Sequence, residues 1–246
     1  MENVTDRTSN PFGMDPPCEA RVPGYGDANA DFHVIGDHPG VHGGIDPVGT
    51  DEDGRPLPVP FTNEAGLRLQ EALVPGGLLA EAGRRPTVDR TFLSYLHTCV
   101  PPGTGPRESG AGSVPSTAVR ANGAGDADAD DPSEPTERDY AEMEAFFDAE
   151  LRAIAAHVLL PVGERAIRHV LAEYTARPTD VDPAAIHATE ILGSGFLVYP
   201  IREPAQWDDG DRDRLVDALR DLRSTDFRRE VDLGRFVPGA DPYHVR

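Results

Sequence analysis

The 246-residue chain is long enough for one domain or at most two, and no apolar run approaches the roughly 20 residues that a membrane-spanning helix needs. It has 23 basic residues, all of them arginine, against 43 acidic residues, so its formal net charge is −20 at pH 7. Such a charge ordinarily argues against a nucleic-acid partner, but carboxylate-rich surfaces also keep proteins hydrated in molar salt, where a Debye length of about 3 Å screens the repulsion, so we expect a halophilic, cytoplasmic protein and do not exclude nucleic acid.

Neither the N-terminus nor the cysteines indicate export. Residues 1–17 lack the apolar region of a signal peptide and are expected to form an extension ahead of a single domain over residues 18–246. Cys18 and Cys99 stand far apart and provide no disulfide framework, so Cys99 is expected to be a small buried apolar side chain. We expect a monomer without a membrane partner.

The first part of the domain predicts a strand, a loop and a helix. Residues 30–36 (ADFHVIG) read as a short buried strand, and a loop rich in Gly, Pro and Asp follows as far as about Pro60. Residues 63–73 have apolar side chains at helical spacing, with Thr62 or Asn63 as the N-cap.

A second strand, a low-complexity segment and a long helix come next. Residues 91–99 (TFLSYLHTC) read as a strand that ends before two prolines. Residues 103–135 consist mostly of Gly, Ala, Ser, Asp and Pro, which cannot bury enough apolar surface, so a disordered insertion is expected there. Residues 136–156 predict an amphipathic helix that begins with a capping box of Thr136 and Asp139.

The last part alternates strands with helices. Residues 157–163 and 195–201 read as strands, whereas residues 164–175 and 211–224 read as helices. Short, fully apolar strands that alternate with helices predict an α/β fold, namely a three-layer α/β/α arrangement with a central, mainly parallel four-stranded sheet. Ligands of such sheets bind beyond the carboxyl ends of the strands.

Two titratable side chains follow the first predicted strand, in the stretch VIGDHPGVHGG (residues 34–44). Asp37 could take part in catalysis or simply form a turn, and His38 could be a solvated loop residue. Together with His42 and Asp46 they could also ligate zinc or manganese, although the spacing matches no established metal site.

Five stretches follow one another along the chain in a recognisable order. They are RVPGYGDANADFHVIGDHPG, GRPLPVPFTNEAGLRL, SYLHTCVPP, FDAELRAIAAHVLLPVGERAIRHVL and FLVYPIREPAQW, and they cover roughly residues 18–225 apart from the insertion. In this order they resemble the uracil-DNA glycosylase superfamily, and most closely its bacterial and archaeal iron–sulfur branch. The resemblance implies an enzyme that flips a damaged nucleotide out of the duplex and cuts its N-glycosidic bond.

The resemblance also implies roles for individual residues. Asp37 falls on the acidic catalytic position, and Phe61 falls on the ring that stacks on the flipped base. The remaining residues expected to contact the substrate are Gly36, Pro39, Gly40, Asn63, Tyr95 and Pro204.

The sequence departs from the family pattern in the expected site. Glu203 takes the place of the terminal histidine, and a glutamate would need a strongly raised pKa to act as a donor. We hypothesise that His38 supplies the missing donor from the first loop. Tyr95 or a neighbour replaces the asparagine that reads the base edge, and a tyrosine has one hydroxyl in place of an amide.

The iron–sulfur ligands of the family are mostly missing. Cys99 stands at one expected position and Met143 near another, whereas Phe12 and Asp15 replace the upstream pair and Cys18 is out of register. Two cysteines cannot hold a four-cysteine cluster, so neither a cluster nor any other cofactor or metal is expected.

The leading prediction is a DNA glycosylase-like hydrolase that acts on uracil or another deaminated base in DNA, with Asp37, His38 and Glu203 as catalytic residues. One alternative is a catalytically diverged relative that binds DNA in a repair assembly. The other is a metal-dependent hydrolase that uses Asp37, His38 and His42.

Overall fold

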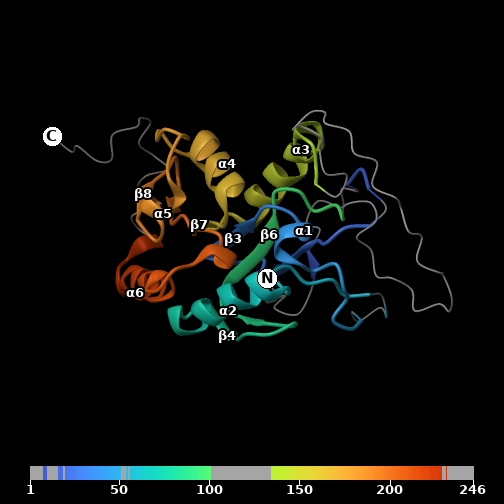
Figure 1. The fold of residues 1–246 in the computed structure, drawn as a ribbon, viewed down its shortest axis with the longest axis horizontal. Helices are drawn as coiled ribbons and strands as arrows, with labels where there is room; N and C mark the ends of the chain where they lie inside the picture. The colour runs from blue at the N-terminus through green and yellow to red at the C-terminus, as the bar shows by residue number, and fades with distance from the viewer. Residues whose placement is uncertain are drawn as a thin grey trace, which may run out of the picture.

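The computed structural model describes residues 8–9, 16–18, 20–50, 54, 56–100, 134–228 and 231. They form three layers, with one sheet between two layers of helices (Figure 1), so the predicted fold class is confirmed. Most of the expected N-terminal extension (1–17) and of the expected insertion (103–135) lies outside the described residues. Among the helices of the described part, none is long and apolar enough to cross a membrane.

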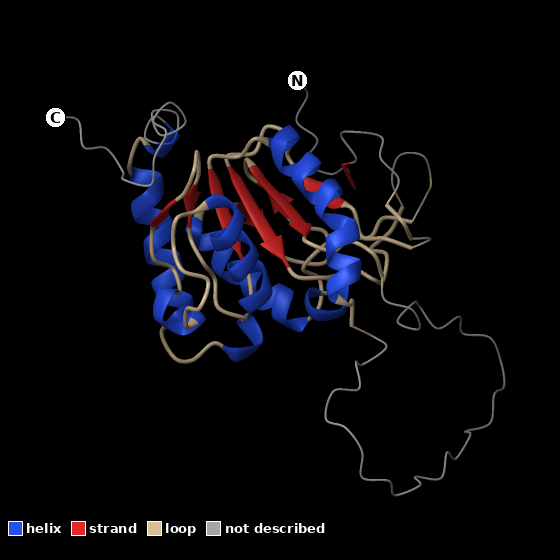
Figure 2. Ribbon diagram, turned by 90° about the horizontal axis from the view of Figure 1, so that it is seen from above, coloured by secondary structure: helices blue, strands red, loops and turns tan. Residues whose placement is uncertain are grey.

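The sheet has the strand order β1-β2-β6-β3-β7-β9-β8, and its four central strands run parallel (Figure 2). These correspond to the four predicted strands: β6 (Thr91–Tyr95), β3 (Phe32–Gly36), β7 (Val158–Pro161) and β9 (Leu197–Val198). Antiparallel edge strands widen the sheet to seven: β1 (Thr8–Ser9), β2 (Gly24–Gly26) and β8 (Ile191–Leu192). A separate two-stranded sheet pairs β4 (Leu79–Glu81) with β5 (Thr87–Val88). The predicted number of strands in the central sheet was therefore too low, because edge strands of two or three residues are too short to show a hydrophobic pattern.

Helices cover both faces of the sheet (Figure 1). One face packs against α2 (Glu64–Gly76) and α6 (Asp211–Ser224), and the other against α3 (Glu137–Ile154) and α4 (Glu164–Tyr174). Strand β3 shows the alternation that this requires, since Val34 belongs to the first core and Ile35 to the second. The connections contain three short helices: α1 (Pro39–His42), α5 (Pro183–Ile186) and the 3₁₀ helix η1 (Pro204–Gln206).

Two predicted helix starts are confirmed by their caps. The side chain of Asn63 accepts the backbone N–H of Gly66 at 2.8 Å at the start of α2. Thr136 and Asp139 form the capping box at the start of α3. Tyr140 completes this first turn, with its N–H donating to the carbonyl of Thr136 at 3.1 Å.

Cys18 and Cys99 form a disulfide, which corrects the expectation that they are unpaired. The two cysteines are 81 residues apart, so their pairing has no local signal. It arises because the folded chain brings the two segments together, with the N–H of Val22 donating to the carbonyl of Thr98 at 2.8 Å. Since disulfides persist mainly in oxidising surroundings, this bond does not favour the expected cytoplasmic location, which stays a prediction.

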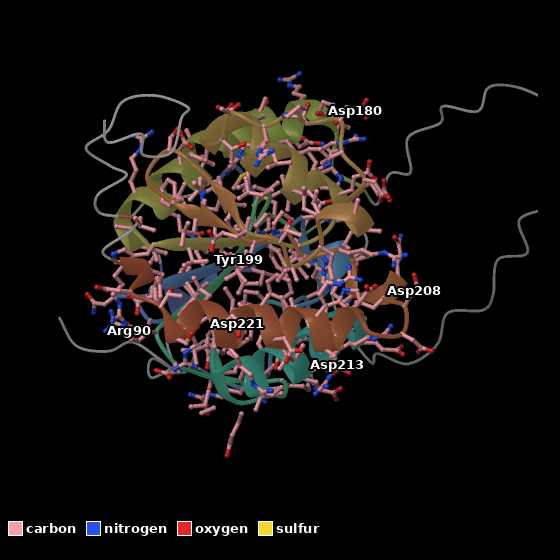
Figure 3. All side chains as sticks on the ribbon, turned by 90° about the vertical axis from the view of Figure 1, so that its left-hand side faces the viewer. Arg90, Asp180, Tyr199, Asp208, Asp213 and Asp221 are labelled. Carbon is pink, nitrogen blue, oxygen red and sulfur yellow. A yellow bond between two sulfur atoms is a disulfide. The ribbon has the colours of Figure 1, made fainter. Side chains whose placement is uncertain are left out.

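The charged residues of α6 illustrate the acidic surface. Figure 3 shows Asp213 and Asp221 along the outer side of this helix, and both are exposed. Its inner side buries Leu215, Leu219 and Leu222 against the sheet. The expectation of a halophilic protein rests on this carboxylate-rich exterior and stays a prediction.

A buried polar cluster lies between the sheet and α3. Nε2 of His33 and Oγ of Ser94 are 2.8 Å apart, and both side chains are fully buried. Oε1 of Glu150 in α3 lies 3.9 Å from Nε2 of His33, and the Glu150 side chain is 12% exposed. Burial raises the pKa of Glu150 to about 7 and lowers the pKa of His33 to about 3, so both groups are uncharged between these values.

Glu150→Gln is expected to raise the free energy of unfolding above pH 7 and to leave it unchanged below pH 4.5. The folded protein keeps the carboxyl proton up to about pH 7, whereas the unfolded chain releases it near 4.5, so the wild-type protein loses stability as the pH rises through this range. Glutamine keeps the shape and has no charge, and we expect a gain of about 1–3 kcal/mol. Urea unfolding at both ends of the range measures the gain, with the exposed Glu144→Gln on the same helix as control. A gain that is absent above pH 7, or equal at both ends, would contradict the prediction.

Candidate active site

The strand order places a crevice at the carboxyl ends of β3 and β7. The chain adds β6 on one side of β3 and then β7 on the other, so the winding direction reverses between β3 and β7. Ligands of open α/β sheets bind at such a reversal. A cleft of about 1130 Å³ opens there, comparable with the larger small-molecule sites. Its lining includes Asp37 after β3, Gly163 and Arg165 after β7, and Arg202 and Glu203 after β9.

Asp37 is held by side chains from two helices. The hydroxyl of Tyr140 in α3 donates to Oδ1 of Asp37, and Nε of Arg165 in α4 lies 3.9 Å from the same oxygen. Among the described residues, Oδ2 has no hydrogen-bond partner. Burial raises the pKa of Asp37 above its ordinary value, although the hydrogen bond from Tyr140 and the charge of Arg165 act in the opposite direction. Within the described part of the chain, Asp37 is thus a cleft-lining carboxyl group with one oxygen anchored and no hydrogen bond to the other.

Glu203 pairs with His42 and not with its neighbour Arg202. Nε2 of His42 lies 3.0 Å from Oε2 of Glu203, and the N–H of Ala205 donates to Oε1 at 3.3 Å. Arg202 instead binds Asp208 at 2.6 Å. Burial alone would raise the pKa of Glu203, but the hydrogen bond and charge of His42 outweigh it, so this pKa lies below its ordinary value. Glu203 is therefore an ionised acceptor with both oxygens engaged, which does not support a donor role.

His38 caps α1 and is not among the residues that line the cleft. Its Nδ1 accepts the N–H of Gly40 at 3.1 Å, and the residue is 4% exposed. Burial lowers the pKa of His38 to about 4, so the ring is neutral at pH 7 with its proton on Nε2. The histidine that reaches the last loop is His42, through its contact with Glu203.

Phe61 and Tyr95 pack behind the cleft and are not part of its lining. Phe61 is 1% exposed, Tyr95 is fully buried, and their ring centroids are 5.3 Å apart. The hydroxyl of Tyr95 donates to the carbonyl of Gly43 and accepts the N–H of Phe61, both at 2.8 Å. His42 packs on Phe61 at 5.1 Å and contacts Glu203, so its ring links the two. The structure therefore does not place the Phe61 ring on the cleft surface.

The backbone of Phe61 adopts a left-handed conformation, with φ at 60°. A bulky residue rarely has this conformation, which costs on the order of 1–3 kcal/mol and is common at functional sites. The amide of Gln70 holds it by donating to the Phe61 carbonyl at 2.8 Å. Gly66 is also needed, because a Cβ there would lie 2.3 Å from the carbonyl carbon of Phe61.

The other predicted contact residues shape the surrounding loops. Gly36 ends β3, where a Cβ would lie 2.8 Å from aromatic ring atoms. Pro39 and Pro204 are the first residues of α1 and η1, Gly40 is exposed, and Asn63 caps α2. None of the five is among the residues that line the cleft.

Tyr140 and Arg165 belong to the site but were not among the predicted residues. Tyr140 lies three residues before Met143 and seven before Phe147, which puts it on the buried stripe of the predicted helix. Arg165 follows the predicted strand end at Gly163 by two residues. The sequence shows the position of Tyr140 on the apolar stripe and of Arg165 after a strand end. No local pattern, however, indicates that the two helix starts meet at Asp37.

Acidic side chains outnumber basic ones around the cleft. The acidic ones are Asp37, Glu134, Glu137, Glu164, Asp182 and Glu203, and the arginines are Arg165, Arg168 and Arg202. At low salt this lining repels a polyanion. In the part of the chain that the structure describes, no group of three or more His, Cys, Asp or Glu side chains could hold a metal ion.

Comparisons with known proteins assign no family to the chain. No protein-family model matches it. A search of curated proteins also finds no match. The resemblance to uracil-DNA glycosylases therefore rests on the sequence patterns alone, and the function has to be inferred from the chemistry of the cleft.

Proposed function

We propose that the protein is a DNA glycosylase-like hydrolase that removes uracil or another deaminated base from DNA. The observation that carries the proposal is the place of Asp37. It follows the carboxyl end of β3, beside the point where the winding direction of the chain reverses between β3 and β7. One oxygen of this carboxyl group is anchored by Tyr140, the other has no hydrogen-bond partner among the described residues, and the residue lines a cleft. This is the arrangement that a general base or a cation-stabilising carboxylate requires.

In the proposed reaction, Oδ2 of Asp37 accepts a proton from a water molecule. The oxygen of that water forms a bond to C1′ of the flipped nucleotide, and the C1′–N bond breaks with its electron pair leaving on the base. Until this proton transfer is complete, the carboxylate is ionised and also stabilises the positive charge that develops on the sugar. The N-terminus of α4, which is the positive end of its helix dipole, lies beside the cleft at Gly163, and no described side chain caps it.

A second candidate function, DNA binding without cleavage, is favoured by one observation. Glu203 stands where the resemblance implies a histidine donor, and both of its oxygens already accept hydrogen bonds. A negative charge at this position disfavours a departing base anion. A relative that has lost this donor could still hold an extruded base.

Incubation in molar KCl with oligonucleotides that contain uracil, hypoxanthine or xanthine tests the proposal. We expect abasic sites, detected by strand cleavage after alkali, on at least one substrate in single- or double-stranded form, and none on the undamaged oligonucleotide. Binding in a mobility-shift assay without any abasic site would replace the proposal with the second candidate. Activity that a chelator abolishes would favour the metal-dependent alternative.

The rate of abasic-site formation is expected to rise as KCl increases from about 0.1 M to about 1 M, because the Debye length then falls from about 10 Å to about 3 Å. The acidic cleft repels the phosphates less under these conditions. Phosphate-binding proteins show the opposite trend, since salt weakens their affinity steeply. A uracil-containing trinucleotide, with few phosphates, should show a smaller rise, and circular dichroism at each salt concentration controls for folding. A rate that falls with salt while the fold is intact would contradict the prediction.

A further inference from the structure

Two side chains that the sequence patterns did not assign to the site converge on a single atom of Asp37. The hydroxyl of Tyr140 donates to Oδ1, and Nε of Arg165 lies 3.9 Å from the same oxygen. Both residues also line the cleft. Among the described residues, the hydrogen bonds and ion pairs of the Asp37 carboxyl group all involve Oδ1, and Asp37 itself lines the cleft.

We propose that Tyr140 and Arg165, the Asp37 clamp, are positioning residues that hold Oδ1 and thereby present Oδ2 of Asp37 to the substrate. The contacts of the clamp with Asp37 do not depend on what the protein does. The role of Oδ2 as the base that meets the substrate rests on the proposed function. A carboxyl group anchored through one oxygen has a defined plane, so its second oxygen points in one direction, as a base in a near-attack geometry must.

The clamp is itself braced on several sides. The guanidinium of Arg165 lies 4.2 Å from the ring centroid of Tyr140, a cation–π contact. Nη1 of Arg165 also binds Oε1 of Glu137 at 2.8 Å. The ring of His97 packs on Tyr140 at 5.5 Å, and the N–H of His97 donates to the carbonyl of Asp37 at 3.1 Å. Tyr140 therefore has little freedom to turn away from Asp37.

The charges around Asp37 set how readily it ionises. Burial raises the pKa of Asp37, and four groups from different elements oppose this: Tyr140 in α3, Arg165 in α4, His42 in α1 and His97 after β6. Burial and the charge of Asp37 raise the pKa of Tyr140, so its hydroxyl stays a donor at neutral pH. Removing either clamp residue takes away a group that favours the ionised carboxylate.

Carbon-13 NMR titration of the aspartate carboxyl groups tests the clamp without any assay of activity. The Asp37 signal is assigned by its loss in Asp37→Asn. We expect a higher pKa of Asp37 in Tyr140→Phe and in Arg165→Gln than in the wild type, and a value closer to the wild type in Arg165→Lys, which restores the charge.

Matched controls come from the same helices. The hydroxyl of Tyr174 in α4 donates to Oδ1 of Asp148 in α3 at 2.8 Å, away from the cleft, so Tyr174→Phe removes a similar hydrogen bond. Arg152 is 77% exposed and pairs with the same Asp148 along α3, so Arg152→Gln is the control for the loss of an arginine. Neither control is expected to change the pKa of Asp37.

Kinetics then distinguish positioning from a purely structural role. Tyr140→Phe is expected to lower kcat about 10- to 100-fold with little change in KM, comparable with the loss of groups that orient metal ligands. The acid limb of its pH–rate profile should move to higher pH together with the NMR titration. An Asp37 pKa unchanged in both clamp variants, or an unchanged kcat and pH profile despite a shifted pKa, would overturn the inference. If the wild type cuts no damaged DNA, the proposed function fails, and the NMR titration alone decides whether the clamp exists.

Discussion

Asp37→Asn is expected to lower the rate of abasic-site formation by about 10²–10⁴-fold, the range for loss of a general acid or base. Asparagine keeps the size of the side chain, and its carbonyl oxygen can still accept the hydroxyl of Tyr140. It cannot take up a proton from water or provide a negative charge beside the sugar. The loss should therefore appear mainly in kcat, measured with the oligonucleotide substrate that the wild type cuts fastest.

The same substitution should not destabilise the protein at neutral pH. Because burial raises the pKa of Asp37, the ionised carboxylate costs folding free energy once the pH exceeds its ordinary value of 3.8, and asparagine removes that cost. Thermal unfolding checks this, with the exposed Asp46→Asn in the following loop as control. An Asp37→Asn rate within about threefold of the wild type, far less than a lost general base costs, would remove Asp37 from the mechanism.

Replacing both cysteines, as Cys18→Ala with Cys99→Ala, is expected to lower the free energy of unfolding by about 2–4 kcal/mol. The disulfide closes a loop across 81 residues, which restricts the unfolded chain strongly. The double substitution also removes a buried contact, because Cys99 is 7% exposed and its sulfur lies 3.8 Å from that of Met143. Guanidinium unfolding of the oxidised proteins measures the difference.

Reduction provides the control for the disulfide. A dithiol reductant should lower the stability of the wild type towards that of the double variant, with the Cys99–Met143 contact retained, and leave the variant unchanged. Oxidised wild-type protein should contain no titratable thiol after unfolding, since it has only these two cysteines. Two free thiols in protein purified without reductant, or a stability that does not respond to reductant, would contradict the prediction.

Properties that depend on near neighbours in the chain could be predicted. Residues 211–224 were predicted as a helix, and α6 has the same bounds, because its apolar spacing needs no distant partner to be recognised. Asn63 and the pair Thr136 and Asp139 cap their helices because each cap involves residues only three positions apart. The parallel sheet followed from the alternation of such elements.

The candidate site was predicted only in part. Asp37 and Glu203 were placed after strands of one parallel sheet, and strands of one sheet end at a common edge, so both line the cleft. His38 was favoured over His42, but the first turn of α1 directs His38 to its own backbone and His42 to Glu203. The sequence alone does not reveal this choice, because it depends on how a single short helix is seated.

The amino-acid pattern was sufficient for the elements, their alternation and the strand ends, since these follow from side-chain spacing and caps within a few residues. Only the folded molecule decided the partners of the side chains: the Cys18–Cys99 disulfide, the His42–Glu203 pair, and the contacts of Tyr140 and Arg165 with Asp37. These partners lie far apart in the chain, and their pairing depends on how the helical layers and loops pack around the sheet. Burial by that packing also sets the pKa of Asp37, which no local sequence pattern encodes.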